Sequence, residues 1–495
     1  MVSVDLGANS GRVAVGNFDG SRLSVAEVNR FANVPVLAHD RLYWDALRLY
    51  DGILEGLGLA SRAARQPVAS VAVDAWGVDF AIVDKAGHLL GNPVHYRDRR
   101  TEQAFEDVRA LVAPREIFQA TGVQLLPINT LYQLWAMQQA GDPALEKGSS
   151  LLMMPDLFNY WLGGVAAQEW TEATTTQCYD IGAGKWAWGL LGRLGLPAWP
   201  FGEVVPSGTV LGPLRPQVAE AVGAGNALVI AVASHDTASA VAAVPFQEPG
   251  CFFVSSGTWS ALGAQMPKPV VDDRSFAAKL TNEGGPGGTS LLMGNLTGLW
   301  LLQECQRKWY RSRGVSDLSQ LLALAEAAPA MRSLVDPNAP EFMPPGDMPA
   351  RIAAACRSTG QEVPESPGEV VRCILESLAF MYRQAVEVIA GVTGRWPPAL
   401  HIVGGGSLNS LLCQWTADAT GLPVWAGPSE ASEVGNLLVQ AMALGELATT
   451  DEARALVRSS FPPVLYEPGD REPWDDSYDR FRRLAELSGS APAQR

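Results

Sequence analysis

Two stretches with a similar pattern of apolar and polar residues lie half a chain apart. The first covers residues 4–15 and the second covers residues 253–263. Each has a β-branched run, a short turn of Gly, Ser or Asn residues and a second strand-like run, which is the pattern of a β-hairpin. Small turn residues let backbone N–H groups converge on an anion. We therefore predict two phosphate-binding hairpins that hold one nucleotide between them.

The rest of the first half alternates strand-like runs with stretches of helical periodicity. Apolar, β-branched runs cover residues 68–73 and 80–83, and helical patterns follow at residues 125–139 and 151–162. Alternation of this kind predicts an α/β layer structure.

Length and the repeated hairpin indicate two domains. A chain of 495 residues exceeds what one hydrophobic core usually supports. A cluster of Pro and Gly at residues 245–250 follows an Ala-rich helical pattern and precedes the second hairpin. Because such clusters mark connections between compact units, we predict one domain over residues 1–244 and another over residues 245–495.

The chain is acidic, with a formal net charge of −15 at pH 7. Binding to nucleic acid or to an anionic membrane requires an excess of Lys and Arg, so we expect neither partner. The sequence opens directly into a strand pattern without the features of a secretory signal, which predicts a cytoplasmic location. The weakly charged stretch at residues 227–246 contains Asp236, and a carboxylate in hydrocarbon is costly, so we expect no membrane span.

Cysteine and histidine spacing does not indicate a zinc site. The six cysteines show no Cys-x-x-Cys pair, and the five histidines do not cluster in the sequence. Cys356 and Cys373 lie on two predicted helices that are candidates for neighbours. In a reducing cytosol we expect them to be buried free thiols.

The first hairpin carries two charged residues suited to nucleotide chemistry. Asp5 ends the first strand, where its carboxylate can hold hydrated Mg²⁺ through water, because Mg²⁺ keeps most of its own shell. Arg12 lies just past the turn, within reach of a phosphate oxygen. An ordinary turn with a surface Arg explains the same residues, so both interpretations stay open.

A second feature is a buried strand that leads into a helix at Ser234, His235, Asp236 and Thr237. In one interpretation Asp236 only caps the helix. In the other, the helix start faces a transferred phosphoryl group and Asp236 accepts a proton from the attacking hydroxyl. Phosphoryl transfer tolerates a weak base, because its loose transition state depends mainly on positioning and charge stabilisation.

Two further patterns concern the nucleotide and a small polyol. The turn at Gly404, Gly405 and Gly406 lacks G-x-G-x-x-G spacing, and we interpret it as a backbone shelf for adenosine. The chain contains no G-x-x-x-x-G-K-[ST], H-R-D or D-F-G, so we predict neither a P-loop enzyme nor a protein kinase. Runs at residues 74–79, 95–99 and 295–303 mix polar and aromatic residues suited to a polyol, although core packing explains Trp76 equally well.

The paired hairpins, the Ser-His-Asp-Thr run and the triple-glycine turn together resemble the FGGY carbohydrate kinases of the actin and Hsp70-like ATPase superfamily. The resemblance covers residues 4–445 and is most specific to the rhamnulokinase branch, through runs at residues 75–80, 96–99, 129–134, 154–158, 171–177, 233–240 and 281–285. It implies an α/β fold with two actin/Hsp70-like (ribonuclease H-like) ATPase domains flanking a catalytic cleft. It also implies phosphorylation of L-rhamnulose at its C1 hydroxyl, with ATP and Mg²⁺ as cofactors, in a monomer or homodimer.

Position by position, the resemblance implies that Asp236 is the catalytic base and that Asp5 is the metal-associated aspartate. It implies substrate contacts at Gly77, His235, Asp236, Thr237 and Asn295, and ATP contacts at Ala8, Asn9, Ser10, Gly11, Arg12, Thr258, Gln303 and Gly405. The broader family usually has a Lys where this chain has Leu131-Tyr132-Gln133, a variant that looks typical of the rhamnulokinase branch.

Three alternatives stay open at this stage. An actin-like or chaperone-like ATPase would share the hairpins but would not need the Ser-His-Asp-Thr helix start. A kinase for L-fuculose or xylulose would share the mechanism and differ in pocket detail. A protein that only senses the sugar would lack catalysis, although every polar residue expected for catalysis is present.

Overall fold

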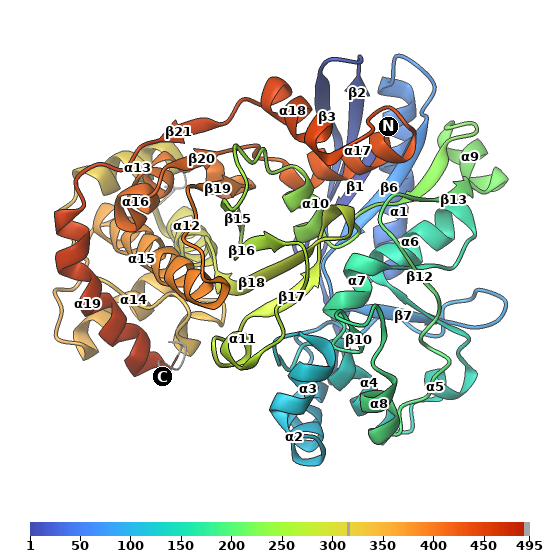
Figure 1. Ribbon diagram of the computed structural model, residues 1–495, viewed down its shortest axis with the longest axis horizontal. Coiled ribbons are helices and arrows are strands. Elements are labelled where there is room, and N and C mark those ends of the chain that lie inside the picture. The colour runs from blue at the N-terminus through green and yellow to red at the C-terminus, as the bar shows by residue number, and fades with distance from the viewer. Residues whose placement is uncertain (314–316, 490–495) are drawn as a thin grey trace. The chain divides into compact units, whose positions relative to one another are not determined.

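The computed structural model describes residues 1–313 and 317–489 (Figure 1). These residues form two compact units, each assembled from several segments. Unit 1 contains Met1–Val244, Gln265–Leu292 and Glu430–Phe461, and unit 2 contains Pro245–Ala264, Met293–Ser429 and the residues from Pro462 onward. The division into residues 1–244 and 245–495 stays a prediction.

Unit 1 is built on a six-stranded sheet with the order β13-β14-β6-β1-β2-β3. The parallel pairs β1·β6 and β14·β6 form its centre, and the other neighbours are antiparallel. Strands β1 and β6 are buried along their whole length, as expected for strands that are covered on both faces. The strands are β1 (Val2–Leu6), β2 (Ser10–Phe18), β3 (Leu23–Ala32), β6 (Ser70–Ala75), β13 (Thr209–Pro213) and β14 (Leu228–Ala231).

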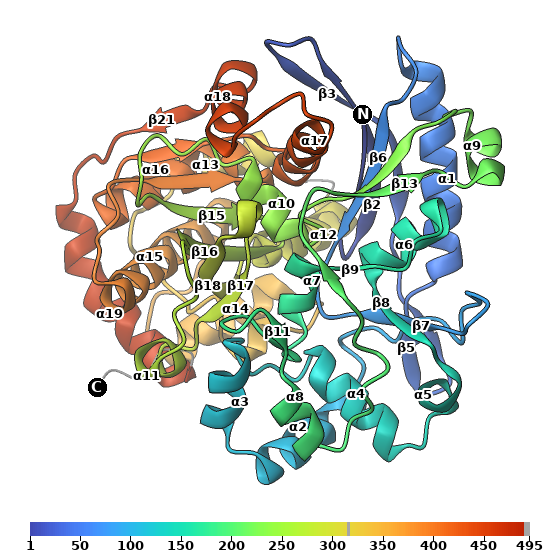
Figure 2. The ribbon, with the colours of Figure 1, turned by 45° about the vertical axis from the view of Figure 1, so that its right-hand side comes forward.

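Helices cover both faces of this sheet (Figure 2). Helices α1 (Ala46–Ala63) and α6 (Met154–Gly163) pack on one face, and α10 (Asp236–Ala242) and α17 (Ala431–Ala443) pack on the other. In both ribbon views α17, which comes late in the chain, lies beside the N-terminal strands. The first segment of unit 1 and its last segment, Glu430–Phe461, therefore pack together at the sheet.

Unit 1 has a second apolar core that contains Phe80 and Tyr132, whereas α9 packs on α1 and α18 packs on β3. The remaining helices of unit 1 are α2 (Arg100–Leu111), α3 (Pro114–Thr121), α4 (Thr130–Gln139), α5 (Pro143–Lys147), α7 (Trp170–Thr175), α8 (Trp188–Arg193), α9 (Pro216–Val222), α11 (Asp273–Ala277) and α18 (Thr450–Ser460). Its shorter strands are β4 (Val36–Ala38), β5 (Arg41–Tyr43), β7 (Phe80–Val83), β8 (Ser150–Met153), β9 (Gln168–Glu169), β10 (Tyr179–Asp180), β11 (Lys185–Trp186), β12 (Val204–Val205) and β17 (Thr281–Gly284).

Unit 2 contains the second predicted hairpin. Strand β15 pairs antiparallel with β16 and parallel with β19. Its strands are β15 (Phe252–Ser256), β19 (Leu400–Val403), β20 (Val424–Ala426) and β21 (Val464–Tyr466), with most of β16 (Trp259–Met266) and of β18 (Ser290–Thr297), whose residues 265–266 and 290–292 are counted in unit 1. Its helices are α12 (Trp300–Arg313), α13 (Leu318–Ala327), α14 (Met348–Ser358), α15 (Pro367–Thr393), α16 (Ser410–Thr420) and α19 (Glu472–Ser488). Both predicted hairpins are confirmed.

Local sequence explains where several elements begin. Helix α15 starts at a capping box in which Ser366 and Glu369 satisfy each other's backbone N–H groups, and it ends at Gly394 in the left-handed conformation. The predicted helix at residues 151–162 is wrong in its first part, where residues 151–153 form strand β8. Pro155 is the reason, because it suits the first turn of a helix but disfavours helical backbone just before it.

Within the part of the chain that the structure describes, no helix combines the length and the apolar character needed to cross a membrane.

Candidate active site

Three carboxylates gather at one edge of the unit 1 sheet. Asp5 in β1 lies opposite Asp74 in β6, and Asp236 follows β14 as the first residue of α10. The pairing of β6 with the β14 end continues through the Ala75 N–H, which donates to the Ser234 carbonyl at 2.9 Å. Because the carboxyl ends of parallel strands meet at one edge, three residues far apart in sequence become neighbours.

Asp5 and Asp74 form a buried carboxyl pair. Burial, and then the charge of Glu433, raise the pKa of Asp5 well above its ordinary value, although Arg12 acts in the opposite direction. Burial, and then the charge of Asp5, likewise raise the pKa of Asp74. Two buried like charges do not ionise together without a compensating cation. The groups around Asp5 and Asp74 therefore supply too little positive charge for both carboxylates to be ionised at once.

Helix α17 supplies the polar groups that hold Asp74. Asn436 Nδ2 donates to Asp74 Oδ1 at 2.5 Å, and Gln440 Nε2 donates to Asn436 Oδ1 at 2.7 Å. Ser70 Oγ donates to Gln440 Oε1 at 2.6 Å. These side chains are buried, so each hydrogen bond replaces one lost to water. The chain fixes the orientation of the Asp74 carboxylate beside Asp5.

Arg12 faces carboxylates in this structure. Its guanidinium lies 2.7 Å from Glu430, 3.0 Å from Glu433 and 3.8 Å from Asp5. Burial alone would lower the pKa of Arg12, but Glu433 and Asp5 outweigh it and raise the pKa. The interpretation of Arg12 as an ordinary surface residue is therefore wrong, and its contact with ATP stays a prediction.

The turn of the first hairpin presents free backbone donors. The Gly7 N–H donates to the Ser10 carbonyl at 2.9 Å, and Asn33 holds the turn through its side chain and backbone at 2.9 and 3.0 Å. Among the described residues, the N–H groups of Ala8 and Asn9 have no protein acceptor. A turn that is fixed from one side and leaves adjacent N–H groups available is suited to an anion.

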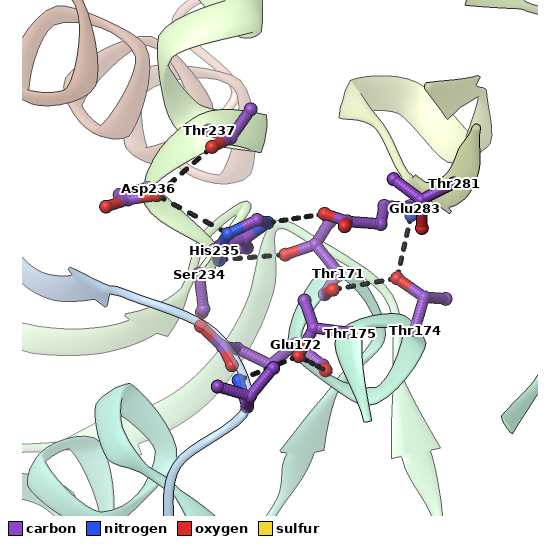
Figure 3. Close-up of polar contacts among 12 residues, drawn as sticks. Thr171, Glu172, Thr174, Thr175, Ser234, His235, Asp236, Thr237, Thr281 and Glu283 are labelled. Atoms are coloured by element: carbon purple, nitrogen blue, oxygen red, sulfur yellow. Dashed lines mark hydrogen bonds and ion pairs between the residues drawn. The ribbon is translucent and has the colours of Figure 1, made fainter. Parts of the chain in front are cut away.

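Asp236 lies beside His235 at the start of α10 (Figure 3). The Asp236 side chain is 31% exposed, and its Oδ1 lies 3.5 Å from His235 Nε2 and accepts from Thr237 Oγ1 at 3.3 Å. His235, not Asp236, occupies the N-cap position of the helix. Burial raises the pKa of Asp236, and the charge of His235 opposes that rise. Asp236 is thus a partly exposed carboxylate of increased basicity, and it lies next to His235, which becomes a cation when protonated.

Helix α7 and its N-cap residue hold the backbone of Ser234 and His235 in place. The His235 N–H donates to Thr171 Oγ1 at 3.0 Å, and the Ser234 N–H donates to Glu169 Oε2 at 3.2 Å. Glu169 also caps α7 by accepting from the N–H groups of Thr171 and Glu172. Burial raises the pKa of Glu169 to about 7. One buried carboxyl group therefore fixes both α7 and the entry to α10.

Gly77 precedes a tight turn that the surrounding side chains hold in place. Val78 has a positive φ of 68°, and the Asp79 N–H donates to the Gly77 carbonyl at 2.9 Å, which is the pattern of a γ-turn. The Val78 N–H donates to Thr175 Oγ1 at 3.0 Å, and the Val78 carbonyl accepts from Thr130 Oγ1 at 2.7 Å. A β-branched residue at positive φ is a genuine outlier, so the packing imposes this conformation. A Cβ at Gly77 would lie 2.8 Å from Thr175.

In unit 2, three of the predicted ATP contacts lie in or beside the second hairpin: Thr258, Gln303 and Gly405. Thr258 lies in the turn, and its Oγ1 donates to Gln303 Oε1 of α12 at 3.1 Å. The triple-glycine turn packs on the same hairpin, because a Cβ at Gly406 would lie 2.1 Å from Ser256 Oγ. A Cβ at Gly405 would meet open space. Asn295, the predicted sugar contact in this unit, is exposed on β18.

Two family models and two relatives cover most of this chain. The model for the N-terminal domain of the FGGY family of carbohydrate kinases matches residues 1–243, and the model for its C-terminal domain matches residues 252–444. A rhamnulokinase of Bacteroides thetaiotaomicron is 41% identical over 480 residues, which are 97% of this chain and 98% of that protein. A rhamnulokinase of Klebsiella pneumoniae is 41% identical over 473 residues, which are 94% of each chain.

The chain belongs to the FGGY family of carbohydrate kinases. The predicted family, its rhamnulokinase branch and the sugar kinase class are thereby confirmed. A solved xylulose kinase from Lactobacillus acidophilus matches 99% of this chain and 98% of its own with a TM-score of 0.81 at 15% identity, which shows the fold. The predicted α/β, two-domain, actin-like fold is confirmed. An actin-like or chaperone-like ATPase that binds protein is not favoured.

Gln133, in the run where the resemblance predicts a departure from the broader family, makes defined contacts in the structure. Gln133 Nε2 donates to Asp79 Oδ1 at 2.9 Å, and Gln133 Oε1 accepts from Arg100 Nη2 at 2.9 Å. Asp79 also accepts from the indole N–H groups of Trp44 and Trp76 at 2.5 and 3.1 Å. In the run predicted as suited to a polyol, the Asp79 carboxylate is buried and Trp76 is a core residue, and the contact of this run with a polyol stays a prediction.

We expect Asp79→Asn to destabilise unit 1. Asp79 is surrounded by N–H donors, and an amide group would place an N–H of its own against one of them. An unsatisfied buried donor costs about 1–3 kcal/mol, and thermal unfolding should report the loss. The matched control is Asp107→Asn, at a partly exposed carboxylate on α2 that accepts from Gln103 and should change the midpoint little. Equal melting temperatures for the two variants would contradict the role of Asp79.

Several residues near the site had no individual role assigned from the sequence, although Glu172 and Glu283 lie in runs that the family resemblance uses. The predicted residues in unit 1, Asp5, Gly77 and His235–Thr237, lie near acidic and amide side chains that sequence reasoning did not assign: Glu169, Glu172, Glu283, Glu433, Asn436 and Gln440. Long stretches of chain separate most of them from their partners. Buried polar residues inside apolar helices, such as Asn436, are the one signal that could have found them. All six cysteines are buried and free, as expected for Cys356 and Cys373.

Proposed function

We propose that this protein is an ATP-dependent rhamnulokinase of L-rhamnose catabolism. It transfers the γ-phosphoryl group of ATP to the C1 hydroxyl of L-rhamnulose and releases L-rhamnulose 1-phosphate and ADP. The observation that carries the substrate is the 41% identity, over nearly the whole length, to two relatives named rhamnulokinase. The position of Asp236 beside His235 supports the chemistry.

Asp236 is the proposed general base. As the C1 oxygen of the sugar attacks the γ-phosphorus, its O–H proton passes to the Asp236 carboxylate, and the bond from the γ-phosphorus to ADP breaks. A base must be ionised and yet basic enough to accept the proton. Burial raises the pKa of Asp236 while His235 limits the rise, which suits both requirements.

The sugar contacts follow from the same segment. His235 and Thr237 flank Asp236, and their side chains offer a donor and a hydroxyl to the sugar. Gly77 is the proposed backbone contact, and Asn295 of unit 2 is the proposed amide contact. For the nucleotide, we propose contacts with Ala8–Arg12, Thr258, Gln303 and Gly405.

We propose that Asp5 and Asp74 associate with Mg²⁺ through its water shell. The pair fits such an ion, because hard carboxylate oxygens are its preferred ligands and a cation offsets the repulsion between two carboxylates that lie opposite each other. Among the described residues, no group of three or more His, Cys, Asp or Glu side chains is arranged to bind a metal directly. When bound with ATP, Mg²⁺ neutralises charge on the phosphates.

Sugar, ATP and Mg²⁺ are the proposed ligands, and we propose a cytoplasmic monomer or homodimer without nucleic-acid or membrane partners. The net charge of −15 supports the last point.

Initial rates of ADP release test the substrate directly. We expect L-rhamnulose to give the highest kcat/KM among L-rhamnulose, L-fuculose, xylulose, ribulose and glycerol. The margin over the nearest ketose is expected to be modest, because a single methyl group discriminates by about 10- to 200-fold. A tenfold lead for xylulose or L-fuculose would reject the substrate and leave the kinase class intact.

A further inference from the structure

His235 has a second acidic neighbour that the catalytic proposal does not use. Its Nδ1 lies 3.0 Å from Glu283 Oε2, on the side of the ring away from Asp236, whose Oδ1 is 3.5 Å from Nε2 (Figure 3). The side chains of His235 and Glu283 are only 12% and 8% exposed. The imidazole therefore lies between two carboxylates, one enclosed and one accessible.

Strand β17 holds Glu283 in place through both of its neighbours. The Gly284 N–H donates to Thr174 Oγ1 at 2.7 Å. Asn282 Nδ2 donates to the Gly122 carbonyl at 3.1 Å, and its Oδ1 accepts from the Val270 N–H at 2.7 Å. Since α7 also anchors the His235 N–H through Thr171, the two partners are fixed relative to one another from the same helix. Hydrogen bonds to other elements of unit 1 therefore fix the backbone on both sides of the His235–Glu283 contact.

We propose that Glu283 is a positioning residue for phosphoryl transfer: its carboxylate pairs with the Nδ1 side of the His235 imidazole, so that Nε2 faces Asp236 and the sugar. This inference rests on the proposed function, in which Asp236 accepts the proton. Fixing one nitrogen of an imidazole by a carboxylate determines the tautomer and the ring orientation at the other nitrogen.

The charges around the ring favour its cationic form. Burial lowers the pKa of His235, but Glu283 and then Asp236 and Glu169 outweigh burial and raise the pKa. Glu172 is a further carboxyl group close to Asp236 and Glu283. An imidazolium beside Asp236 keeps that base ionised at lower pH. Loss of the Glu283 charge should therefore lower the pKa of His235.

The variant Glu283→Gln tests the role, because glutamine keeps an acceptor for Nδ1 and removes the charge. We expect kcat to fall by about 10- to 100-fold, less than the roughly 10²- to 10⁴-fold that a general-base step contributes, because Asp236 itself is retained. In the pH profile of kcat, the alkaline limb, which follows His235, should move to lower pH by about one unit. A merely structural role would lower activity without narrowing the profile.

The matched control is Asp84→Asn, which removes a carboxylate 3.3 Å from the Nδ1 of another histidine, His88. That pair is exposed and lies away from the proposed chemistry, so kcat and its pH profile should stay unchanged. Melting temperatures of both variants establish that the fold is retained.

Nitrogen-15 NMR of labelled imidazoles gives a readout that needs no substrate. The His235 signal, assigned by its loss in His235→Gln, should titrate above the ordinary value of about 6.5 in the unaltered protein and lower in Glu283→Gln. A titration midpoint of His235 below about 6.5 in the unaltered protein would overturn the proposal. This measurement does not depend on whether the variant folds. If the titration behaves as expected and L-rhamnulose is not the substrate, the pairing stands and the proposed function fails.

Discussion

We expect Asp236→Asn to lower kcat by about 10²- to 10⁴-fold while the affinities for ATP and sugar change by less than about tenfold. The amide has nearly the same size as the carboxylate but cannot accept the proton of the C1 hydroxyl. The loss corresponds to about 3–5 kcal/mol of transition-state stabilisation. Calorimetry gives the affinities, and coupled ADP release gives kcat.

The comparison with Asp5→Asn separates the proton acceptor from the metal site. Asp5 belongs to the buried pair with Asp74, so its amide variant should need more Mg²⁺ for half-maximal rate as well as losing rate. Asp236→Asn should leave the Mg²⁺ requirement near that of the unaltered protein. Near-normal turnover in Asp236→Asn, with an unaltered melting temperature, would contradict the assignment of the base.

The second large effect concerns stability and pH, and it arises at Glu172. Among the described residues, neither carboxylate oxygen of Glu172 has a hydrogen-bond partner, and the side chain is fully buried. Burial, followed by the charges of Asp156 and Glu169, raises the pKa of Glu172 well above its usual range. The folded protein therefore keeps this proton at pH values where the unfolded chain releases it.

The sign of the pH effect follows from that difference. Above the unfolded pKa of about 4.5 the folded state binds more protons, so stability falls as pH rises, until the folded pKa is passed. One such group contributes about 1.4 kcal/mol per pH unit in this window. We expect Glu172→Gln to remove this contribution, so that stability falls less steeply between about pH 5 and pH 7.

Urea unfolding midpoints over that pH range measure the slope. Glu203→Gln is the control, because Glu203 is an exposed carboxylate in the same unit and its loss should leave the slope unchanged. If Glu172→Gln and the unaltered protein lost stability equally with rising pH, Glu172 would be ionised in the folded state.

Features that depend on short stretches of chain were predictable from the sequence. Both hairpins were, because turn residues and flanking β-branched runs act over about ten residues. The helix start at His235 and Asp236 follows from the change from a buried strand to an Ala-rich helix. The motif resemblance identified the family, whereas the strand at residues 151–153 was missed, because a short apolar run suits a strand and a buried helix equally well.

The tertiary structure alone decided which side chains surround these motifs. Asn436 and Glu433 approach Asp74 and Arg12 because α17 returns to the N-terminal sheet, and Glu283 approaches His235 because β17 contacts α7. Sequence periodicity reports which face of an element is buried, but it does not report which distant element covers that face. Charges and hydrogen bonds act over a few ångströms in space, so the protonation of Asp5, His235 and Glu172 depends on packing and not on neighbours in the chain.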